Sequence, residues 1–530
     1  MTERVYLYDC TLRDGQQMQG IDWNAADKRA IAEALDGFGV DVIEGGWPGA
    51  NPTDDAFFAD PPKLAHARLS AFGMTRRAGR SASNDPGLSA IFAAKTRVVT
   101  LVGKSWDFHA RVALGVDEDE NLAMIADSIA EACRRAEEVN LDAEHFFDGF
   151  RRNPDYALAC LEAGHKAGAH WLVLCDTNGG AMPHEVAEAV ETVRARLPAA
   201  RVGIHCHNDS EQAVANSLAA VRAGARQVQG TLNGIGERCG NANLVSIIPN
   251  LMLKLGFETG VSRDGLRGLT RLSRMLDERL NRAPARGSAY VGESAFAHKG
   301  GLHVSAVERD PATYEHVAPE TVGNRRHIVV SDQAGRSNIL AQLRDVGIEV
   351  EPDDPRVQKL LAEVKAREFE GYSYDGADAS FELLARRMLG EVPTYFTLES
   401  FRTLVERRNG GESLSEATVK LAIGGTRVLT VAEGNGPVNA LDTALRAALL
   451  PHYPELGPLH LTDYKVRILA PERATAAVTR VMIESADAAG NRWTTVGVSG
   501  NVIEASFGAL ADSYCWLLLR EGARPSALAA

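Results

Sequence analysis

Residues 5–15, VYLYDCTLRDG, are an apolar segment that leads directly into a charged pair, Arg13-Asp14. The apolar run from Val5 to Thr11 predicts a buried strand. A doubly wound open sheet would place a glycine-rich fingerprint after its first strand, and the stretch from Thr11 to Gly15 lacks that pattern. A (β/α)8 barrel, which carries polar residues at the C-terminal ends of its strands, is therefore favoured over the open sheet.

The following residues repeat the order of strand and helix. Further strands are predicted at residues 40–45, 68–72, 97–102, 141–147, 171–176, 202–207 and 227–232. Helices with apolar residues at three- and four-residue spacing are predicted between them, at 26–38, 121–138, 185–196 and 211–223. Eight such units in roughly 250 residues match an α/β fold of the TIM-barrel type.

Polar residues stand at the ends of these strands, where barrel enzymes assemble their sites. They are Arg13, Asp14, Glu44, Arg76, Lys104, Glu144, Asp148, Thr177, His205, His207, Asn233, Glu237 and Asn241. Helix capping or loop solvation explains any one of them, but not the whole set. His205 and His207 are two residues apart on a strand, so both imidazoles point to one side while Cys206 faces away. Together with Asp14, they favour a divalent metal (Mn, Mg, Zn or Co) over a sulfur-bound structural zinc.

Composition limits the class of protein. A chain of 530 residues is too long to fold around one hydrophobic core, so two or three domains are expected. A net charge of -13 argues against nucleic-acid binding. The seven cysteines are scattered without a C-x-x-C pair, which is typical of reduced thiols in the cytoplasm. No signal peptide is recognised at the start, and no apolar run is long enough to cross a bilayer, so no membrane partner is expected.

We predict three domains: the barrel at 1–264, a helical linker region at 265–392 and a C-terminal α+β domain at 393–530. The linker has predicted helices at 266–281, 337–345 and 355–370 and a glycine- and histidine-rich segment, SAYVGESAFAHKGGLHVSAV, at 288–307. The last domain has an internal repeat. Strands predicted at 416–423 and 426–432, and again at 461–468, 474–485 and 492–498, each lead through a Gly-Asn loop into a helix.

Three motifs resemble those of a known enzyme family. DCTLRDGQQ at 9–17, HCHND at 205–209 and NGIGERCGNAN at 233–243 are similar to the acyl-CoA-condensing synthases and lyases related to isopropylmalate synthase, homocitrate synthase and hydroxymethylglutaryl-CoA lyase. The segments IEGGWPGANP, VGKSWDFH, DAEHFFDG, LCDTNGG, AEGNGPVNALD and DYKVRIL resemble the citramalate synthase branch, almost end to end. Cys10 departs from the family, which usually has threonine there.

This resemblance implies a reaction and a set of site residues. The reaction is the condensation of acetyl-CoA with pyruvate and water to (R)-citramalate and CoA, on a route to isoleucine. Asp14, His205, His207 and Asn241 match the metal ligands, and the metal would polarise the keto group. Arg13 would donate to the developing charge on the same oxygen. Thr177 would bind the keto-acid carboxylate, and Glu44 and Glu144 would orient substrate and Arg13 or manage protons.

Acetyl-CoA must lose a methyl proton, so the site needs a base. His303 matches the family's catalytic histidine, with Tyr314 as the nearby hydroxyl; His298 is the competing candidate for the base. In this family the loop reaches the barrel of the other subunit, which implies a homodimer. The last domain resembles a regulatory domain, so isoleucine is the expected effector, held by the loops Gly434-Asn435-Gly436 and Gly500-Asn501.

Several alternatives stay open. The keto acid could be 2-ketoisovalerate, as in isopropylmalate synthase and leucine synthesis, or 2-ketoglutarate, as in homocitrate synthase. One methylene changes binding by only about 1–3 kcal/mol, and the sequence does not show the pocket volume. Cys239 is interpreted as an ordinary loop thiol rather than as a nucleophile. Glu237 is interpreted as a residue that organises its loop rather than one that takes part in the chemistry. A non-catalytic amino-acid sensor is the alternative from another class.

Overall fold

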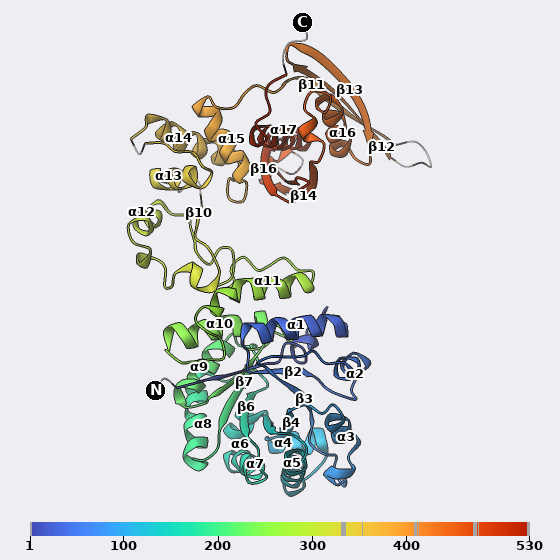
Figure 1. Ribbon diagram of the computed structural model, residues 1–530, viewed down its shortest axis with the longest axis vertical. Coiled ribbons are helices and arrows are strands. Elements are labelled where there is room, and N and C mark those ends of the chain that lie inside the picture. The colour runs from blue at the N-terminus through green and yellow to red at the C-terminus, as the bar shows by residue number, and fades with distance from the viewer. Residues whose placement is uncertain are drawn as a thin grey trace. The chain divides into compact units, whose positions relative to one another are not determined.

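The computed structural model describes residues 3–329, 335–351, 353–407, 411, 413–469, 474 and 476–526. It divides into two compact units. The first comprises Met1–Phe296 and Val317–Arg325, and the second comprises Ala297–His316 and Arg326–Ala530. The first unit contains the barrel, and the second contains further helices and two antiparallel sheets (Figure 1).

The first unit is a closed parallel barrel with its strands in chain order. They are β1 (Tyr6–Asp9), β2 (Val42–Gly46), β3 (Arg68–Met74), β4 (Val98–Lys104), β5 (Glu138–Glu144), β6 (Trp171–Asp176), β7 (Val202–Cys206) and β8 (Gln227–Gly230). The last strand closes the barrel because it pairs with β1, Tyr8 opposite Gln229. This confirms the (β/α)8 prediction and excludes the open sheet.

Helices surround the strands (Figure 1). They are α1 (Ala25–Phe38), α2 (Pro52–Ala59), α3 (Pro86–Ala93), α4 (Asp107–His109), α5 (Glu118–Cys133), α6 (Phe146–Arg152), α7 (Pro154–Lys166), α8 (Pro183–Arg196), α9 (Ala213–Ala223), α10 (Leu244–Pro249) and α11 (Leu269–Arg279). The helix predicted at 121–138 ends too late, because α5 stops at Cys133 and Glu138 begins β5. The predicted end of the fifth strand at Phe147 is also wrong. Phe146 and Phe147 start α6, and both rings are buried in the barrel's core, where apolar helix residues look like strand residues in sequence.

A polar layer lies inside the barrel beneath its C-terminal mouth. The Tyr8 hydroxyl donates to Glu44 Oε2 at 2.6 Å, and its oxygen lies 3.0 Å from Ser70 Oγ and 2.8 Å from Thr100 Oγ1. All four side chains are fully buried. A carboxyl group in this position must be hydrogen-bonded to be tolerated, and these contacts fix Glu44 directly below the mouth.

The second unit begins with a short parallel pair, β9 (Ala297–His298) and β10 (His327–Ile328). Its helices are α12 (Gly301–Arg309), α13 (Arg336–Asp345), α14 (Pro355–Glu370) and α15 (Asp378–Leu389). Two sheets follow, β11 (Thr397–Arg407), β12 (Ser413–Ile423) and β13 (Thr426–Gly434), then β14 (His460–Ile468), β15 (Thr479–Ala486) and β16 (Arg492–Ser499). Each sheet leads into a helix, α16 (Pro437–Leu449) or α17 (Val502–Arg520). This confirms the predicted repeat and adds β11, which the sequence pattern did not name.

Helix α17 is long and apolar enough, by length and composition, to cross a membrane. The sequence pattern predicted no such run. Its buried residues, among them Ala509, Leu510 and Tyr514, belong to the hydrophobic core formed with the two C-terminal sheets. Core packing therefore accounts for its apolar composition.

Candidate metal centre and active site

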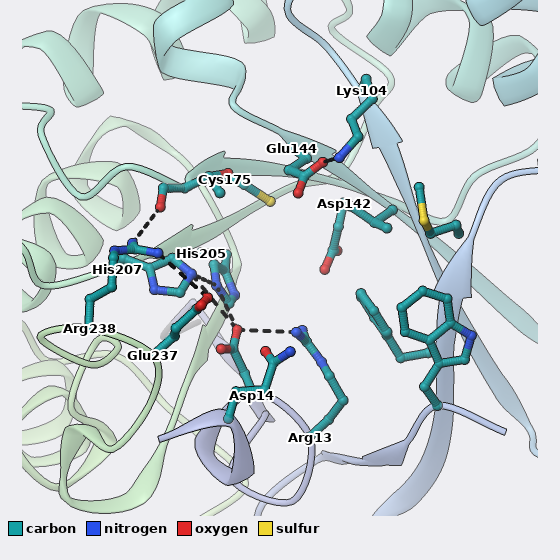
Figure 2. A pocket seen from close by; sticks show the side chains of 16 residues that line it. Arg13, Asp14, Lys104, Asp142, Glu144, Cys175, His205, His207, Glu237 and Arg238 are labelled. Carbon is teal, nitrogen blue, oxygen red and sulfur yellow. Dashed lines mark hydrogen bonds and ion pairs between the residues drawn. The ribbon is translucent and has the colours of Figure 1, made fainter. Parts of the chain in front are cut away.

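The ends of β1 and β7 bring together three buried side chains that can hold a metal ion. Asp14 Oδ2 lies 3.4 Å from His205 Nε2 and 3.9 Å from His207 Nε2 (Figure 2). The two Nε2 atoms are 3.4 Å apart. His207 lies one residue beyond β7 and pairs with Asn241 in an isolated bridge. The predicted convergence of both imidazoles on one point therefore appears in the geometry.

The electrostatics of this cluster suit a cation. Burial alone would raise the pKa of Asp14, but the Arg13 charge and the hydrogen bond with His205 hold it well below the usual range. Burial lowers the pKa of His207 to about 4, so its imidazole is neutral near pH 7. Burial also acts to lower the pKa of His205, but the hydrogen bond with Asp14 outweighs burial and raises it. The cluster offers an ionised carboxylate and neutral or exchangeable ring nitrogens.

Asn241 supplies a further observation. Its Oδ1 is buried and has no hydrogen-bond partner within the described residues, while its Nδ2 donates to Ile235 O at 3.3 Å. A buried acceptor without a donor is costly unless another group satisfies it. One carboxylate, two imidazoles and an amide oxygen are ligands that Mn, Co, Zn or Mg accept. The side chains thus fit the divalent cation that the sequence predicted.

A cavity of about 220 Å³ opens at the mouth of the barrel (Figure 2). It is lined by Arg13, Asp14, Gln17, Trp47, Phe72, Met74, Val102, Lys104, Asp142, Glu144, Cys175, Thr177, His205, His207, Glu237 and Arg238. Eight of the polar residues predicted at strand ends are therefore brought together here: Arg13, Asp14, Lys104, Glu144, Thr177, His205, His207 and Glu237.

Arg13 is held from three sides. Its Nε donates to Glu44, its Nη1 lies 3.3 Å from Asp14 Oδ2, and its guanidinium carbon lies 3.8 Å from the centroid of the Phe72 ring. Glu44 is fully buried beneath it. The structure thus places Glu44 as a support for Arg13, and the guanidinium retains donors that face the cavity.

Two further predicted residues, Glu144 and Thr177, are positioned by contacts with neighbouring strands and loops. Lys104 Nζ pairs with Glu144 Oε2 across β4 and β5. Thr177 Oγ1 accepts the backbone N–H of His145 at 2.8 Å. His145 has φ 58°, a left-handed conformation that non-glycine residues rarely adopt, and its Nδ1 lies 3.2 Å from Asp148 Oδ2. Strain of this kind persists where surrounding contacts determine it, often at a functional site.

Arg76 and Asn233, two more of the polar residues predicted at strand ends, have structural partners outside the cavity. Arg76 pairs with Glu120 and Asp127, away from the barrel's central cavity. Asn233 Nδ2 donates to Ser273 O and Asp277 Oδ1, both at 3.1 Å. Cys239 is exposed on the loop whose Glu237 lines the cavity.

The sequence pattern missed several residues of the cavity. Asp142 is buried on β5, and burial together with the charge of Glu44 raises its pKa to about 7. It stands two residues before Glu144, so strand alternation could have revealed it. Arg238 bridges two loops, donating to Asp209 and to Thr177 O. Trp47 and Cys175 add apolar wall, and their pattern in sequence is that of ordinary core residues.

His303 and Tyr314 belong to the second unit. His303 lies on α12, and its ring stacks on that of Tyr314 with centroids 4.1 Å apart. His298 Nε2 lies 3.1 Å from the buried Glu315 Oε1, and Glu315 also accepts two hydrogen bonds from Arg326 at 2.6 Å. Of the two candidate bases, His303 is exposed and His298 is buried in a salt-bridge network.

The second unit has a cavity of its own, about 600 Å³ in volume. It is lined by Asn435, Gly436, Pro437, Val438, Asn439, Asp442, Arg446, Leu459, His460, Leu461 and Tyr464. The first of the two predicted effector loops contributes to it through Asn435 and Gly436, and Gly500 and Asn501 are not among its lining residues within the described part of the chain.

A closed (β/α)8 barrel with a buried Asp-His-His cluster and a fixed arginine at its mouth defines a barrel enzyme with a candidate divalent-metal centre. The chain belongs to the HMGL-like family, whose model matches residues 4–272, and within that family it belongs with the (R)-citramalate synthases. A homocitrate synthase post-HMGL domain-like model matches residues 290–370, and a LeuA allosteric (dimerisation) domain model matches residues 375–517.

The similarity to individual proteins extends over nearly the whole chain. It is 53% identical to an (R)-citramalate synthase of Aquifex aeolicus, covering 98% of this chain and 99% of that protein. It is 51% identical to an (R)-citramalate synthase of Geobacter sulfurreducens, covering 96% of each. Identity is 33% to a probable 2-isopropylmalate synthase of Methanopyrus kandleri, covering 96% of this chain and 97% of that protein.

Proposed function

We propose that this chain is an acyltransferase that condenses acetyl-CoA with pyruvate and water to give (R)-citramalate and CoA. The observation that carries the proposal is the placement of the Arg13 guanidinium beside the Asp14, His205 and His207 cluster in one cavity. Relatives named (R)-citramalate synthase, at 43–53% identity, support pyruvate over 2-ketoisovalerate, because the isopropylmalate synthases are more distant at 30–33%.

Asp14, His205, His207 and Asn241 would hold the metal. When bound, a divalent cation there would act as a Lewis acid on the keto group. Arg13 donates toward the same oxygen, and its contacts with Glu44 and Phe72 hold it in place without further ordering. Because Thr177 Oγ1 already accepts an N–H, its own proton is left to donate to the keto-acid carboxylate. Glu144, paired with Lys104, would orient the substrate or manage protons.

His303 would remove the methyl proton of acetyl-CoA, with the Tyr314 hydroxyl beside it. The resulting carbon nucleophile forms the new bond to the keto carbon, and water then cleaves the thioester and releases CoA. We propose that His303 acts on the barrel of the partner subunit in a homodimer. The match to a dimerisation domain supports a dimer.

The remaining parts of the proposal concern the domains, the regulation of the enzyme, its pathway and its location in the cell. We propose three domains at 1–264, 265–392 and 393–530, the last binding isoleucine as an inhibitor in the 600 Å³ cavity near Asn435 and Gly436. The enzyme would serve isoleucine synthesis in the cytoplasm. Isothermal titration of isoleucine, leucine and valine tests this part, and no binding of any of the three would leave a purely dimerising domain.

The decisive experiment follows thiol release from acetyl-CoA with pyruvate, 2-ketobutyrate, 2-ketoisovalerate or 2-ketoglutarate, with and without Mn or Mg. Release that is strongest with pyruvate and lost with a chelator supports the proposal. A preference for 2-ketoisovalerate would move the enzyme to leucine synthesis. No release with any keto acid would favour a non-catalytic sensor. The matched control is an Arg13→Ala chain. It keeps the predicted metal ligands but lacks the guanidinium, so its release of thiol should be weak even with metal present.

A further inference from the structure

Beneath the metal centre, three buried side chains form a hydrogen-bonded chain. His205 Nδ1 lies 2.9 Å from Gln229 Oε1, and Gln229 Nε2 donates to Asp142 Oδ1 at 3.0 Å. Gln229 stands opposite His205 in the register of β7 and β8, and it is fully buried. Asp142 is also buried, at the floor of the cavity (Figure 2). None of the catalytic steps proposed above uses Gln229 or Asp142.

The two ends of the Gln229 amide are chemically different, and its neighbours distinguish them. Gln229 Nε2 donates to Asp142 Oδ1, an oxygen that can accept whether the carboxyl group is neutral or ionised, so the NH2 end of the amide faces Asp142. Cys10 Sγ–H points to Gln229 Oε1 at 3.9 Å, which places a second donor at the oxygen end. Oε1 can only accept, so His205 Nδ1 must carry a proton. Nε2, which faces Asp14 Oδ2, is then the only ring nitrogen that can give its lone pair to a metal.

We infer that Asp142 and Gln229 are positioning residues that fix the ring tautomer of His205 and so present its Nε2 to the metal. The inference rests on the proposed metal site. Outer partners of this kind orient ligand histidines in metal sites, and their loss typically weakens metal binding about 10–100-fold. Cys10, the departure from the family's usual threonine, takes part by donating to the same amide oxygen.

The test is isothermal titration of Mn²⁺ or Co²⁺ into the metal-free full-length protein, with the visible spectrum of bound Co²⁺ as a second readout. Asp142→Asn keeps the size of the side chain but lets Gln229 take either orientation, and Gln229→Met removes both hydrogen bonds. Each is expected to weaken metal affinity about 10–100-fold and to change the Co²⁺ spectrum. Gln229→Glu keeps an acceptor for His205 Nδ1, so it should recover most of the affinity.

Asn140→Ala is the matched control. Asn140 is buried on the same strand as Asp142 and its Nδ2 donates to Thr100 Oγ1 at 3.2 Å, so it shares the cost of a buried cavity but not the chain to His205. Its metal affinity should stay within about twofold of wild type. Folded Asp142→Asn and Gln229→Met proteins with wild-type affinity would overturn the inference, whether or not citramalate is made. If affinity falls as expected but no keto acid releases CoA, the inference stands and the proposed function fails.

Discussion

Arg13 and Glu44 form an ion pair at the mouth of the barrel, with Arg13 Nε donating to a carboxylate that is itself fully buried. The other oxygen of Glu44 accepts from the Tyr8 hydroxyl at 2.6 Å. The guanidinium therefore cannot turn away from Asp14 without breaking a buried charge-assisted hydrogen bond. The two carboxylates therefore have different roles: Glu44 holds Arg13 in place, and Asp14 faces the two histidines.

Replacing Arg13 by lysine should remove most of the activity. A lysine ammonium cannot bind Glu44 and donate to the substrate with the geometry of a planar guanidinium, although it keeps the charge. We expect kcat to fall about 100- to 1,000-fold, the loss found when one donor to a developing oxyanion is removed. Steady-state kinetics with pyruvate measure this. A kcat within about threefold of wild type would mean that only the charge matters.

Removing the metal should abolish activity reversibly. Dialysis against a chelator should stop CoA release, and Mn or Mg should restore it in wild type. His207→Ala should bind metal weakly and respond little to added metal, because one of the three clustered ligands is lost. His184→Ala, an exposed histidine on α8, is the control and should behave as wild type. Full activity in chelated wild-type protein would contradict the metal site.

Thr177 should set the affinity for the keto acid. Thr177→Val keeps the shape but removes the hydroxyl, and a hydrogen bond to a charged group contributes about 1.5–3 kcal/mol. We expect the KM for pyruvate to rise about 10- to 100-fold while the KM for acetyl-CoA changes little. Thr177→Ser keeps the hydroxyl and should stay near wild type. A raised KM for pyruvate in Thr177→Ser together with a near-wild-type KM in Thr177→Val would show that the methyl group, not the hydroxyl, is what matters.

Sharing of the site between subunits predicts complementation. Asp14→Ala and His303→Ala chains should each be inactive, and a mixed dimer should regain one intact site. Random mixing would then restore about a quarter of wild-type activity in a symmetric dimer. Co-expression with two affinity tags isolates the mixed species. If no activity returns, the base and the metal centre belong to the same chain or His303 is not the base.

Local patterns predicted much of the fold and the site. The strand predicted at Trp171–Asp176 coincides with β6, because its apolar run is bounded by polar turns. His205 and Asp14 lie within recognisable motifs, and strand alternation predicts that His205 and His207 point to the same side. Gln229 could not be assigned a role, because its contact with His205 depends on the pairing of β7 with β8, which becomes known only once the barrel is closed. The left-handed backbone of His145 likewise depends on contacts with neighbouring loops.

Asp9 should make the stability of the barrel depend on pH. It is fully buried and accepts from Thr11 N at 2.8 Å and Thr11 Oγ1 at 2.9 Å, and burial outweighs these bonds to raise its pKa from 3.8 to about 7. Between these values the folded chain holds a proton that the unfolded chain has released. The contribution of Asp9 to stability is therefore complete below the unfolded pKa and is lost as pH rises toward 7, by up to about 1.4 kcal/mol per pH unit.

Asp9→Asn cannot ionise, so it should lack this dependence. In urea unfolding at pH 5, 6, 7 and 8, the free energy of unfolding of Asp9→Asn relative to wild type should increase from pH 5 to 7 and then level off. The buried environment produces this sign, because it favours the neutral carboxyl over the carboxylate. Parallel pH profiles for the two proteins would mean that the Thr11 hydrogen bonds keep Asp9 ionised in the folded barrel despite its burial.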